Sequence, residues 1–290
     1  MQMIPFDKRD GFIWINGSFE KWDEAKVHVL NHGLHYASCV FEGIRIYNGK
    51  IFKLNEHIQR LYKSAEILDL QIPFQLNDIC LHVKDVVKKQ NVKNGYIRPV
   101  VWRGSEMMAI SAEKASTNIA IACWEWPSYF SPDKLLQGIN LSVAEWTRPS
   151  PQSAPTNSKA AGLYMICSLS KHKAEKAGFD DALMLDYRGY IAEATGANIF
   201  FVKNGELFTP KPDCFLDGIT RQTVIKIAKR IKIKVTEDHF KIDFVSNCSE
   251  AFLTGTAVEI TPINSIDNYK FKERTITKKL IDEFNKEVTS

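Results

Sequence analysis

The segment Ser158–Tyr164, SKAAGLY, sets a single lysine among small residues and places a tyrosine five positions after it. A lysine withdrawn from water is more easily deprotonated, so it can act as a base or form a Schiff base with an aldehyde. The small neighbours would let a flat ring lie against the amine. Lys159 is therefore a candidate catalytic residue, although a lone lysine is more often an ordinary surface residue.

Four further groups suit one cofactor when they are considered together. Glu193, in IAEATGANIF, could hold a pyridine nitrogen protonated. The segment 218–220, GIT, opens a predicted helix, and the N–H groups of a helix N-terminus bind phosphate. Thr256 adds a hydroxyl and Arg60 a positive charge. With an aldehyde for Lys159, these groups describe pyridoxal 5′-phosphate (PLP).

Each of these groups also has a structural explanation when it is considered alone. Glu193 lies at a predicted strand end and could simply be exposed, and Thr220 could serve only as a helix cap. Arg60, on a predicted helix, is more often a salt-bridge partner than a ligand. The segment 255–257 could be only a turn. The case for a cofactor depends on all of these residues serving one molecule.

Other kinds of chemistry find less support in the sequence. His28, His32 and His35 have a spacing that could suggest a metal site, but Gly33 interrupts them and residues 27–30 favour a strand. No carboxylate pattern completes a ligand set, so no metal is predicted. The sequence has no P-loop, no G-x-G-x-x-G and no G-x-S-x-G, which leaves NTPase, dinucleotide-binding and hydrolase functions without a motif.

The composition is that of a globular protein with ample material for a core. Of 290 residues, 44% are hydrophobic and 25% charged, and the net charge of +4 is spread along the chain, which argues against a nucleic-acid partner. The six cysteines lie far apart, as expected for free thiols in a reducing compartment. With no signal-peptide pattern and no apolar run of about 20 residues, we expect a cytoplasmic protein without a membrane partner.

The elements that must position these groups alternate between strands and helices. Asn-Gly pairs at 16–17, 48–49 and 204–205 predict tight hairpin turns. Asn55 is expected to cap one helix, and a second is expected to begin after Asn77 and to end at Asn94-Gly95. Residues 160–178 predict a further helix that ends at Gly178, and Arg188-Gly189 predict the tip of a hairpin.

The prolines and glycine of 126–138 mark a break in this pattern. We expect a small two-layer α/β domain over 1–126, a linker over 127–138 and a larger PLP-binding domain over 139–290. The fold class predicted in this way is mixed α/β.

The set of motifs resembles the branched-chain aminotransferases among the fold-type IV PLP enzymes, and the resemblance covers nearly the whole chain. The matching segments occur in the family's order: NHGLHYASCVFEGIR, EHIQRL, YIRP, SKAAGLY, YIAEATGANIF, LDGITR and LTGTAVEITP. It implies a two-domain enzyme with a β-barrel-like α/β second domain. The implied reaction moves the amine of leucine, isoleucine or valine to 2-oxoglutarate, which gives the branched-chain 2-oxo acid and glutamate.

The resemblance also implies roles for individual residues toward the cofactor. Lys159 would bind PLP covalently and shuttle the substrate proton, Tyr164 would hydrogen-bond the phenolic oxygen of PLP, and Glu193 would face the pyridine nitrogen. The residues implied to hold the phosphate are Arg60, Ile219, Thr220 and Thr256.

On the substrate side, the resemblance implies an apolar pocket that must also accept glutamate. Arg98 and tyrosine hydroxyls would host the second carboxylate of glutamate, and the Ala257 N–H would help to hold the α-carboxylate. Leu163 and Asp217 depart from the family pattern and leave the ranking of substrates open. The other residues implied to line the pocket are Tyr36, Phe41, Gly43, Trp126, Tyr129, Tyr164 and Thr256.

Two related activities share part of this motif set. D-amino-acid transaminases and aminodeoxychorismate lyase also have the lysine, the glutamate and a GIT-type segment, and the lyase releases pyruvate instead of moving an amine. The segments EGIR and YIRP favour the branched-chain enzymes. The expected partners are small-molecule substrates and further copies of the chain, as a homodimer or an assembly of dimers.

Overall fold

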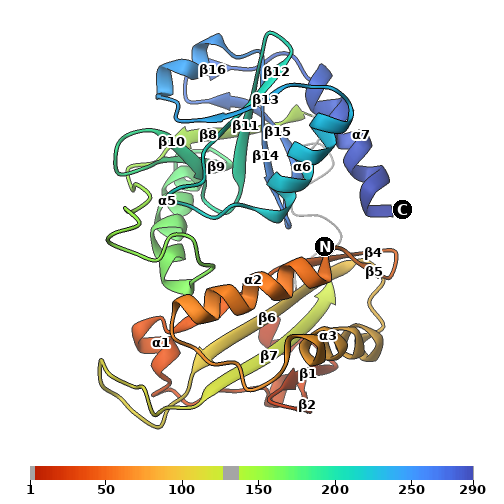
Figure 1. Cartoon of the computed structure of the whole chain (residues 1–290), viewed down its shortest axis with the longest axis vertical. Helices are drawn as coiled ribbons and strands as arrows, with labels where there is room; N and C mark the ends of the chain where they lie inside the picture. The colour runs from red at the N-terminus through yellow and green to blue at the C-terminus, as the bar shows by residue number, and fades with distance from the viewer. Residues whose placement is uncertain (1–3, 127–136, 290) are drawn as a thin grey trace. The chain divides into compact units, whose positions relative to one another are not determined.

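The computed structural model describes residues 4–126 and 137–289. The chain divides into two compact units, Met1–Pro127 with Ser158–Gly162 (unit 1) and Ser128–Asn157 with Leu163–Ser290 (unit 2) (Figure 1). The short segment Ser158–Gly162 thus groups with unit 1 and not with the residues on either side of it. The domain bounds expected from the sequence stay a prediction, and the expected linker, 127–138, lies almost wholly outside the described residues.

The described strands of unit 1 form one antiparallel sheet in the order β2-β1-β7-β6-β4-β5, with β3 paired to β6. The strands are β1 (Phe12–Ile15), β2 (Ser18–Lys21), β3 (Cys39–Phe41), β4 (Ile44–Tyr47), β5 (Lys50–Ile51), β6 (Gly95–Arg103) and β7 (Thr117–Glu125). The helices are α1 (His32–Tyr36), α2 (Leu54–Ile67) and α3 (Leu76–Gln90), with short 3-10 turns η1 (Phe6–Lys8) and η2 (Trp22–Glu24).

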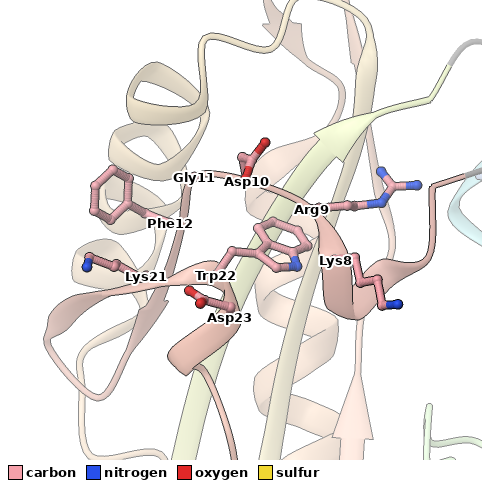
Figure 2. A pocket seen from close by; sticks show the side chains of 8 residues that line it. All are labelled: Lys8, Arg9, Asp10, Gly11, Phe12, Lys21, Trp22 and Asp23. Atoms are coloured by element: carbon pink, nitrogen blue, oxygen red, sulfur yellow. The ribbon is translucent and has the colours of Figure 1, made fainter.

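A pocket of about 360 Å³ lies at the beginning of unit 1, where the chain enters β1 and leaves β2 (Figure 2). The pocket contains no residue that the sequence nominated for chemistry. Its lining consists of Lys8, Arg9, Asp10, Gly11, Phe12, Lys21, Trp22 and Asp23.

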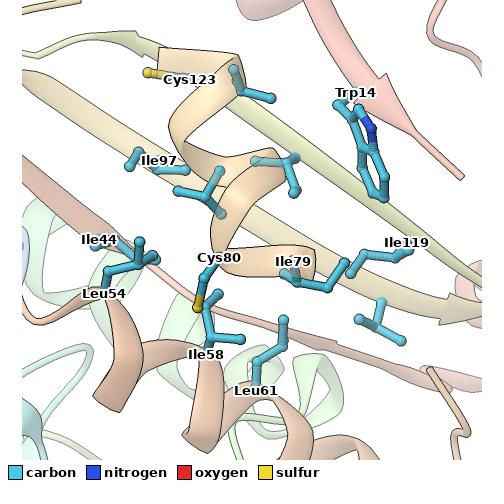
Figure 3. Close-up of a cluster of buried hydrophobic side chains, with 14 of the residues drawn as sticks. Trp14, Ile44, Leu54, Ile58, Leu61, Ile79, Cys80, Ile97, Ile119 and Cys123 are labelled. Atoms are coloured by element: carbon cyan, nitrogen blue, oxygen red, sulfur yellow. The ribbon is translucent and has the colours of Figure 1, made fainter. Parts of the chain in front are cut away.

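The core of unit 1 lies between α2, α3 and one face of the sheet (Figure 3). Ile58 and Leu61 of α2 and Ile79 of α3 are buried against strand residues such as Ile97 and Ile119. Along β6, burial alternates with a period of two, so Ile97 and Val101 face this core while Arg98 lies on the opposite face. The helices therefore leave the other face of β6 available for polar and aromatic side chains.

The three predicted Asn-Gly turns are confirmed. Asn16-Gly17 joins β1 to β2, Asn48-Gly49 joins β4 to β5, and Asn204-Gly205 joins two strands of unit 2. All six residues have positive φ, which asparagine and glycine adopt at little cost.

The predicted helix ends in unit 1 are wrong by several residues. The residue that caps α2 is Lys53, with φ of 51°, and not Asn55, and α3 begins at Leu76 and not after Asn77. Asn91, in the left-handed conformation, ends α3 three residues before the expected Asn94-Gly95. Helical spacing identified both helices, but the direction from which the chain enters each one decides the cap.

The described strands of unit 2 form a second sheet in the order β10-β9-β8-β15-β14-β11-β12-β13, with β16 paired to β15. A further pairing of β10 with β11 closes six of these strands into a ring, which agrees with the predicted barrel-like domain. The strands are β8 (Ile139–Val143), β9 (Asp181–Leu185), β10 (Ile191–Ala194), β11 (Asn198–Lys203), β12 (Glu206–Pro210), β13 (Val235–Asp238), β14 (Glu250–Gly255), β15 (Glu259–Ile266) and β16 (Tyr269–Lys270).

Among the described residues of unit 2, three long helices accompany this sheet: α5 (Met165–Lys176), α6 (Ile219–Arg230) and α7 (Thr275–Thr289). The 3-10 turn η3 (Ala161–Tyr164) precedes α5, so the helix expected over 160–178 is shorter at both ends, and η4 (Ile242–Asn247) precedes β14. The expected hairpin at Arg188-Gly189 is confirmed between β9 and β10. Within the described ranges, no helix is both long enough and apolar enough to cross a membrane.

Candidate active site

Lys159 is held in unit 1 by backbone contacts on both sides of its α-carbon. Its N–H donates to the Ser64 hydroxyl of α2 (3.0 Å), and its carbonyl accepts from the N–H of Phe41 at the end of β3 (3.2 Å). The amine lies 5.0 Å from the centre of the Phe41 ring. Ser158 and Ala160 are buried while Lys159 is half-buried, so the small neighbours support the backbone and leave the side chain at the surface of unit 1.

Arg60 of α2 is fixed by Glu42, which follows β3. Arg60 Nε donates to Glu42 Oε1 (2.6 Å), and Nη2 donates to Oε2 (3.0 Å). This side-on, two-bond geometry orients the whole guanidinium plane. The interpretation of Arg60 as a salt-bridge partner is therefore confirmed, and the pair leaves the arginine as the more exposed member, at 16% against 0% for the glutamate.

Two more donors complete the surroundings of the Glu42 carboxylate. His57 Nδ1 lies 2.7 Å from Oε2, and the Gly43 N–H donates to the same oxygen (3.2 Å). Burial would raise the pKa of Glu42, but Arg60 and His57 hold it well below its usual range. Because an ionised carboxylate only accepts hydrogen bonds, His57 carries its proton on Nδ1, and burial lowers the pKa of His57.

The face of β6 away from the helices gathers several residues expected to contact substrate. The Arg98 guanidinium lies 4.5 Å from the centre of the Phe41 ring, and its Nη2 is 3.5 Å from the Tyr96 hydroxyl. The Tyr96 and Trp126 rings are 5.1 Å apart. At Gly43, an added Cβ would overlap the Tyr96 hydroxyl, so this position requires glycine. Tyr96 itself was not predicted from the sequence.

One of the expected aromatic wall residues, Tyr36, is not part of this cluster. Tyr36 is 42% exposed, and its ring packs at a tilted angle against the buried His32 ring of α1, with 4.6 Å between the ring centroids. Within this chain it does not close a pocket. Tyr129 lies outside the described residues.

Glu193 in unit 2 is buried, so its interpretation as an exposed residue is wrong. It is the third residue of β10, and its carboxylate lies 3.4 Å from Arg148 Nε. Burial opposes the charge of Arg148, but the interactions with Glu193, Cys167 and Tyr164 together outweigh it, so the pKa of Arg148 lies above its usual value. Arg148 also interacts with the predicted Tyr164 and donates to the Leu163 carbonyl (3.3 Å), which connects β10 with the start of α5.

The N-terminus of α6 has the form of an anion site. Its N-cap is Gly218, which has no side chain to satisfy the first N–H groups, so the interpretation of Thr220 as a cap is wrong. Thr220 is the second helical residue, after Ile219. The first N–H groups of a helix have no intrahelical acceptor, and the helix dipole favours a negative ligand there.

The turn that carries Thr256 and Ala257 joins β14 to β15. A Cβ on Gly255 would lie 3.4 Å from Ala197 Cβ, so this turn approaches the turn between β10 and β11. Asn198 is the first residue of β11 and pairs with Thr254 of the neighbouring strand β14. Its side-chain amide donates to the Glu193 carboxylate. Unit 2 thus brings together Glu193, the start of α6 and the Thr256 turn.

The histidines considered as metal ligands have structural contacts instead. His32 bonds Ser38 and the Ala109 carbonyl, and residues 27–30 form no strand, contrary to expectation. In the described part of unit 2, Asp186, Asp213 and Cys214 lie close enough to share a metal ion. The Arg188 guanidinium already lies 2.7 Å from Asp186 and 2.9 Å from Asp213, so a positive charge occupies this position.

The sequence did not indicate the residues that orient the predicted ones. Arg148 contacts Glu193, His57 contacts Glu42, and Asn198 contacts Gly218. The two residues of each pair are far apart in the sequence. The one available signal was the EGIR motif, which contains Glu42, but the motif assigns no role to the Glu42 carboxylate. Local spacing cannot reveal such pairs, because strand pairing and helix packing create them.

The chain is similar to proteins of one enzyme class over nearly its full length. Residues 39–266 match the family described as amino-transferase class IV. A Rickettsia felis protein named "Probable branched-chain-amino-acid aminotransferase" is 45% identical over 290 residues, which cover 99% of each chain.

Two solved structures of branched-chain amino acid aminotransferases are similar to this chain. The structure from Escherichia coli is 37% identical with a TM-score of 0.92, and the match covers 95% of this chain and 94% of the other. The structure from Thermobaculum terrenum, in its PLP-form, is 31% identical with a TM-score of 0.88, and the match covers 96% and 94%. Both matches confirm the predicted mixed α/β fold.

Proposed function

The chain belongs to the class IV amino-transferase family, and on this premise we propose that it is a branched-chain-amino-acid transaminase. It moves the amine of leucine, isoleucine or valine to 2-oxoglutarate and releases the branched-chain 2-oxo acid and glutamate. The observation that carries this proposal is the arrangement of unit 2, where a buried carboxylate, a helix N-terminus without a side-chain cap and a threonine turn converge.

The residues present fit pyridoxal 5′-phosphate as the cofactor. The α6 N-terminus offers N–H groups for a phosphate, and the Gly218 cap keeps side-chain atoms away from them. The Thr254 hydroxyl, next to this region, is buried and has no hydrogen-bond partner among the described residues. Glu193, stabilised as a carboxylate by Arg148, suits a protonated pyridine nitrogen.

Each of these groups holds or orients one part of the cofactor. Ile219 and Thr220 bind the phosphate through their N–H groups, with the Thr256 hydroxyl and the Arg60 guanidinium as further donors. Glu193 holds the proton on the pyridine nitrogen, and the Tyr164 hydroxyl bonds the phenolic oxygen. When bound, PLP withdraws electrons from the substrate α-carbon, which is the chemistry that the protein itself lacks.

Lys159 moves the proton in this proposal. Its amine would take the proton from the substrate α-carbon and hold it for transfer to the aldehyde carbon of PLP. The Lys159 amine lies 5.0 Å from the centre of the Phe41 ring, and this ring reduces access of water to one side of the amine. The backbone bonds of Lys159 to Ser64 and Phe41 hold the base of the side chain in place while the amine moves.

The substrate side chain is assigned to the face of β6 that carries Phe41, Trp126 and Arg98. Aromatic rings favour an apolar side chain through burial, at about 25 cal/mol per Å². The same rings penalise the second carboxylate of glutamate unless a cation meets it, and Arg98 supplies that cation. Tyr36 and Tyr129 are proposed to complete the wall, Gly43 and Thr256 to line it, and the Ala257 N–H to bind the α-carboxylate.

The two related activities are less favoured. A D-amino-acid transaminase or an aminodeoxychorismate lyase would share Lys159, Glu193 and the α6 start, so the site geometry alone does not exclude them. The full-length similarity to proteins named as branched-chain aminotransferases favours the first function. An assay with D-alanine, 4-amino-4-deoxychorismate and L-leucine separates the three.

The surface of unit 1 supports assembly of the chain into a homodimer, or into an assembly of dimers. Large apolar side chains are exposed on two segments, around α1 and around residue 110, and such a concentration marks an interaction surface. The exposed apolar residues are Val27, Val29, Leu30, Leu34, Met108 and Ile110.

The six free thiols of the chain also suit a reducing cytoplasm.

Replacement of the lysine tests the proposed function directly. In Lys159→Ala we expect leucine:2-oxoglutarate turnover to fall by more than about 10⁴-fold, because loss of a base costs about 10²–10⁴-fold and loss of the covalent link adds to it. PLP should remain bound through its phosphate, as measured by absorbance after gel filtration. Lys63→Ala, which removes an exposed lysine of α2, should leave turnover unchanged. Activity of Lys159→Ala within tenfold of wild type would contradict the assignment.

A further inference from the structure

Asn198, the first residue of β11, contacts two of the proposed cofactor-binding groups through one side-chain amide. It is 4% exposed. Its Nδ2 donates to Glu193 Oε2 (3.2 Å) and to the Leu216 carbonyl (3.0 Å), while its Oδ1 accepts the N–H of Gly218 (3.1 Å). Both amide donors and the acceptor are used, so the orientation of the amide is fixed by its partners.

The two groups joined by this amide belong to different elements. Glu193 lies on β10, directly opposite Asn198 in the strand register, and Gly218 is the N-cap of α6. A Cβ on residue 218 would overlap Asn198 Oδ1, so the approach of the helix start to the amide depends on glycine. The amide therefore sets the position of the helix N-terminus relative to the carboxylate.

We propose that Asn198 is a positioning residue that matches the ring-nitrogen site to the phosphate site. The ring nitrogen and the phosphate of PLP are joined by a planar ring and one short CH2–O link, so the distance between them varies only over a limited range, and Glu193 and the α6 start must lie within that range for both ends to bind at once. Asn198 holds that separation through its three hydrogen bonds to Glu193, Leu216 and Gly218. This inference rests on the proposed function, because it takes PLP as the ligand.

Two substitutions divide the role of the amide. Asn198→Ala removes all three hydrogen bonds. Asn198→Asp keeps the acceptor for the Gly218 N–H but removes the donors and places a second carboxylate beside Glu193, which raises the pKa of Glu193. A control is Asn140→Ala, since the Asn140 amide also bridges two side chains of unit 2, Asn264 and Ser265, away from the cofactor groups.

Binding of inorganic phosphate to the PLP-free protein, measured by calorimetry, reports on the α6 start without any catalysis. We expect Asn198→Ala to weaken binding of phosphate and of PLP by about tenfold each, the effect of losing one well-placed hydrogen bond. Asn198→Asp should bind phosphate within about twofold of wild type. Both variants should show a kcat at saturating PLP at least about tenfold below wild type, and Asn140→Ala should match wild type in all three measurements.

A purely structural role predicts a different pattern. Asn198→Ala would then lower the melting temperature as Asn140→Ala does, with phosphate affinity and kcat at saturating PLP unchanged, and this result would overturn the proposal. Two independent variants keep the test decisive if one of them does not fold. The proposed function stands or fails separately, because it requires only that the wild-type protein binds PLP and transaminates leucine.

Discussion

Each unit of this chain contains a glutamate–arginine pair at its proposed cofactor groups. The two pairs differ in which residue is more exposed to solvent. In unit 1 the glutamate, Glu42, is fully buried and the arginine, Arg60, is the more exposed member. In unit 2 the arginine, Arg148, is 5% exposed in its side chain and Glu193 is 11% exposed. In both pairs the more exposed residue is the one assigned to the ligand, and its partner lies deeper.

The difference shows how one type of ion pair serves two tasks. Unit 1 buries the carboxylate and presents the guanidinium, which suits the phosphate of the proposed cofactor; unit 2 does the reverse, which suits its protonated pyridine nitrogen. The pairs also differ in tightness. Two hydrogen bonds of 2.6 and 3.0 Å fix Arg60, whereas Arg148 Nε lies 3.4 Å from Glu193, which is further held by Asn198.

The largest effect that tests this comparison is expected in unit 2. Glu193→Gln keeps the shape of the side chain but removes the charge that holds the proton on the pyridine nitrogen. We expect turnover to fall by about 10²–10³-fold, within the range for loss of a proton-handling group, while PLP remains bound. Steady-state kinetics at saturating PLP and absorbance of the bound cofactor measure the two effects. Loss of PLP with normal turnover after resupply would mean that Glu193 only anchors the cofactor.

The corresponding change in unit 1 should affect binding instead of turnover. Arg60→Lys keeps a positive charge near the phosphate but loses the planar, two-bond fit to Glu42. We expect the dissociation constant of PLP to rise about tenfold and kcat at saturating PLP to stay within about threefold. Lys63→Ala, on the exposed side of the same helix, is the control. A fall in kcat that excess PLP does not restore would place Arg60 in the chemistry.

Replacement of Arg98 tests whether unit 1 has a second cation, one that binds the side-chain carboxylate of glutamate. In Arg98→Met we expect the single-turnover rate with glutamate to fall about tenfold more than the rate with leucine, because only glutamate brings a second carboxylate to the aromatic face. Arg98 contacts Phe41 and Tyr96, so a structural role is the competing explanation. Equal losses for both amino acids would support that explanation and leave dual recognition to tyrosine hydroxyls.

The smallest effect concerns the buried carboxylate of unit 1 and its histidine. Burial lowers the pKa of His57, so below about pH 6.5 the unfolded chain takes up a proton that the folded chain resists. Stability should therefore decrease as the pH falls. Between pH 7.5 and 5.5 we expect wild type to lose about 1 kcal/mol more than His57→Gln, measured by denaturant unfolding. His28→Gln, which replaces an exposed histidine, should behave as wild type.

The sequence by itself determined the features that depend on neighbouring residues. The three Asn-Gly turns follow from the positive φ that these residues tolerate, and the helical spacing of apolar residues located α2 and α3. The order of the motifs likewise nominated Lys159 and Glu193, because each motif is a short continuous segment. Helix caps were predicted less well, since Lys53 and Asn91 take left-handed conformations that the path of the chain imposes.

Only the tertiary structure decided how the nominated groups are oriented and charged. Glu193 is buried because β10 lies inside a closed sheet, and its partner Arg148 comes from a distant loop. Arg60 is oriented by Glu42 because α2 packs on the sheet beside β3. Electrostatic interactions and burial act through space, whereas sequence patterns report on residues close together along the chain. For that reason the chemistry could be named from the sequence, but the residues that hold it in place could not.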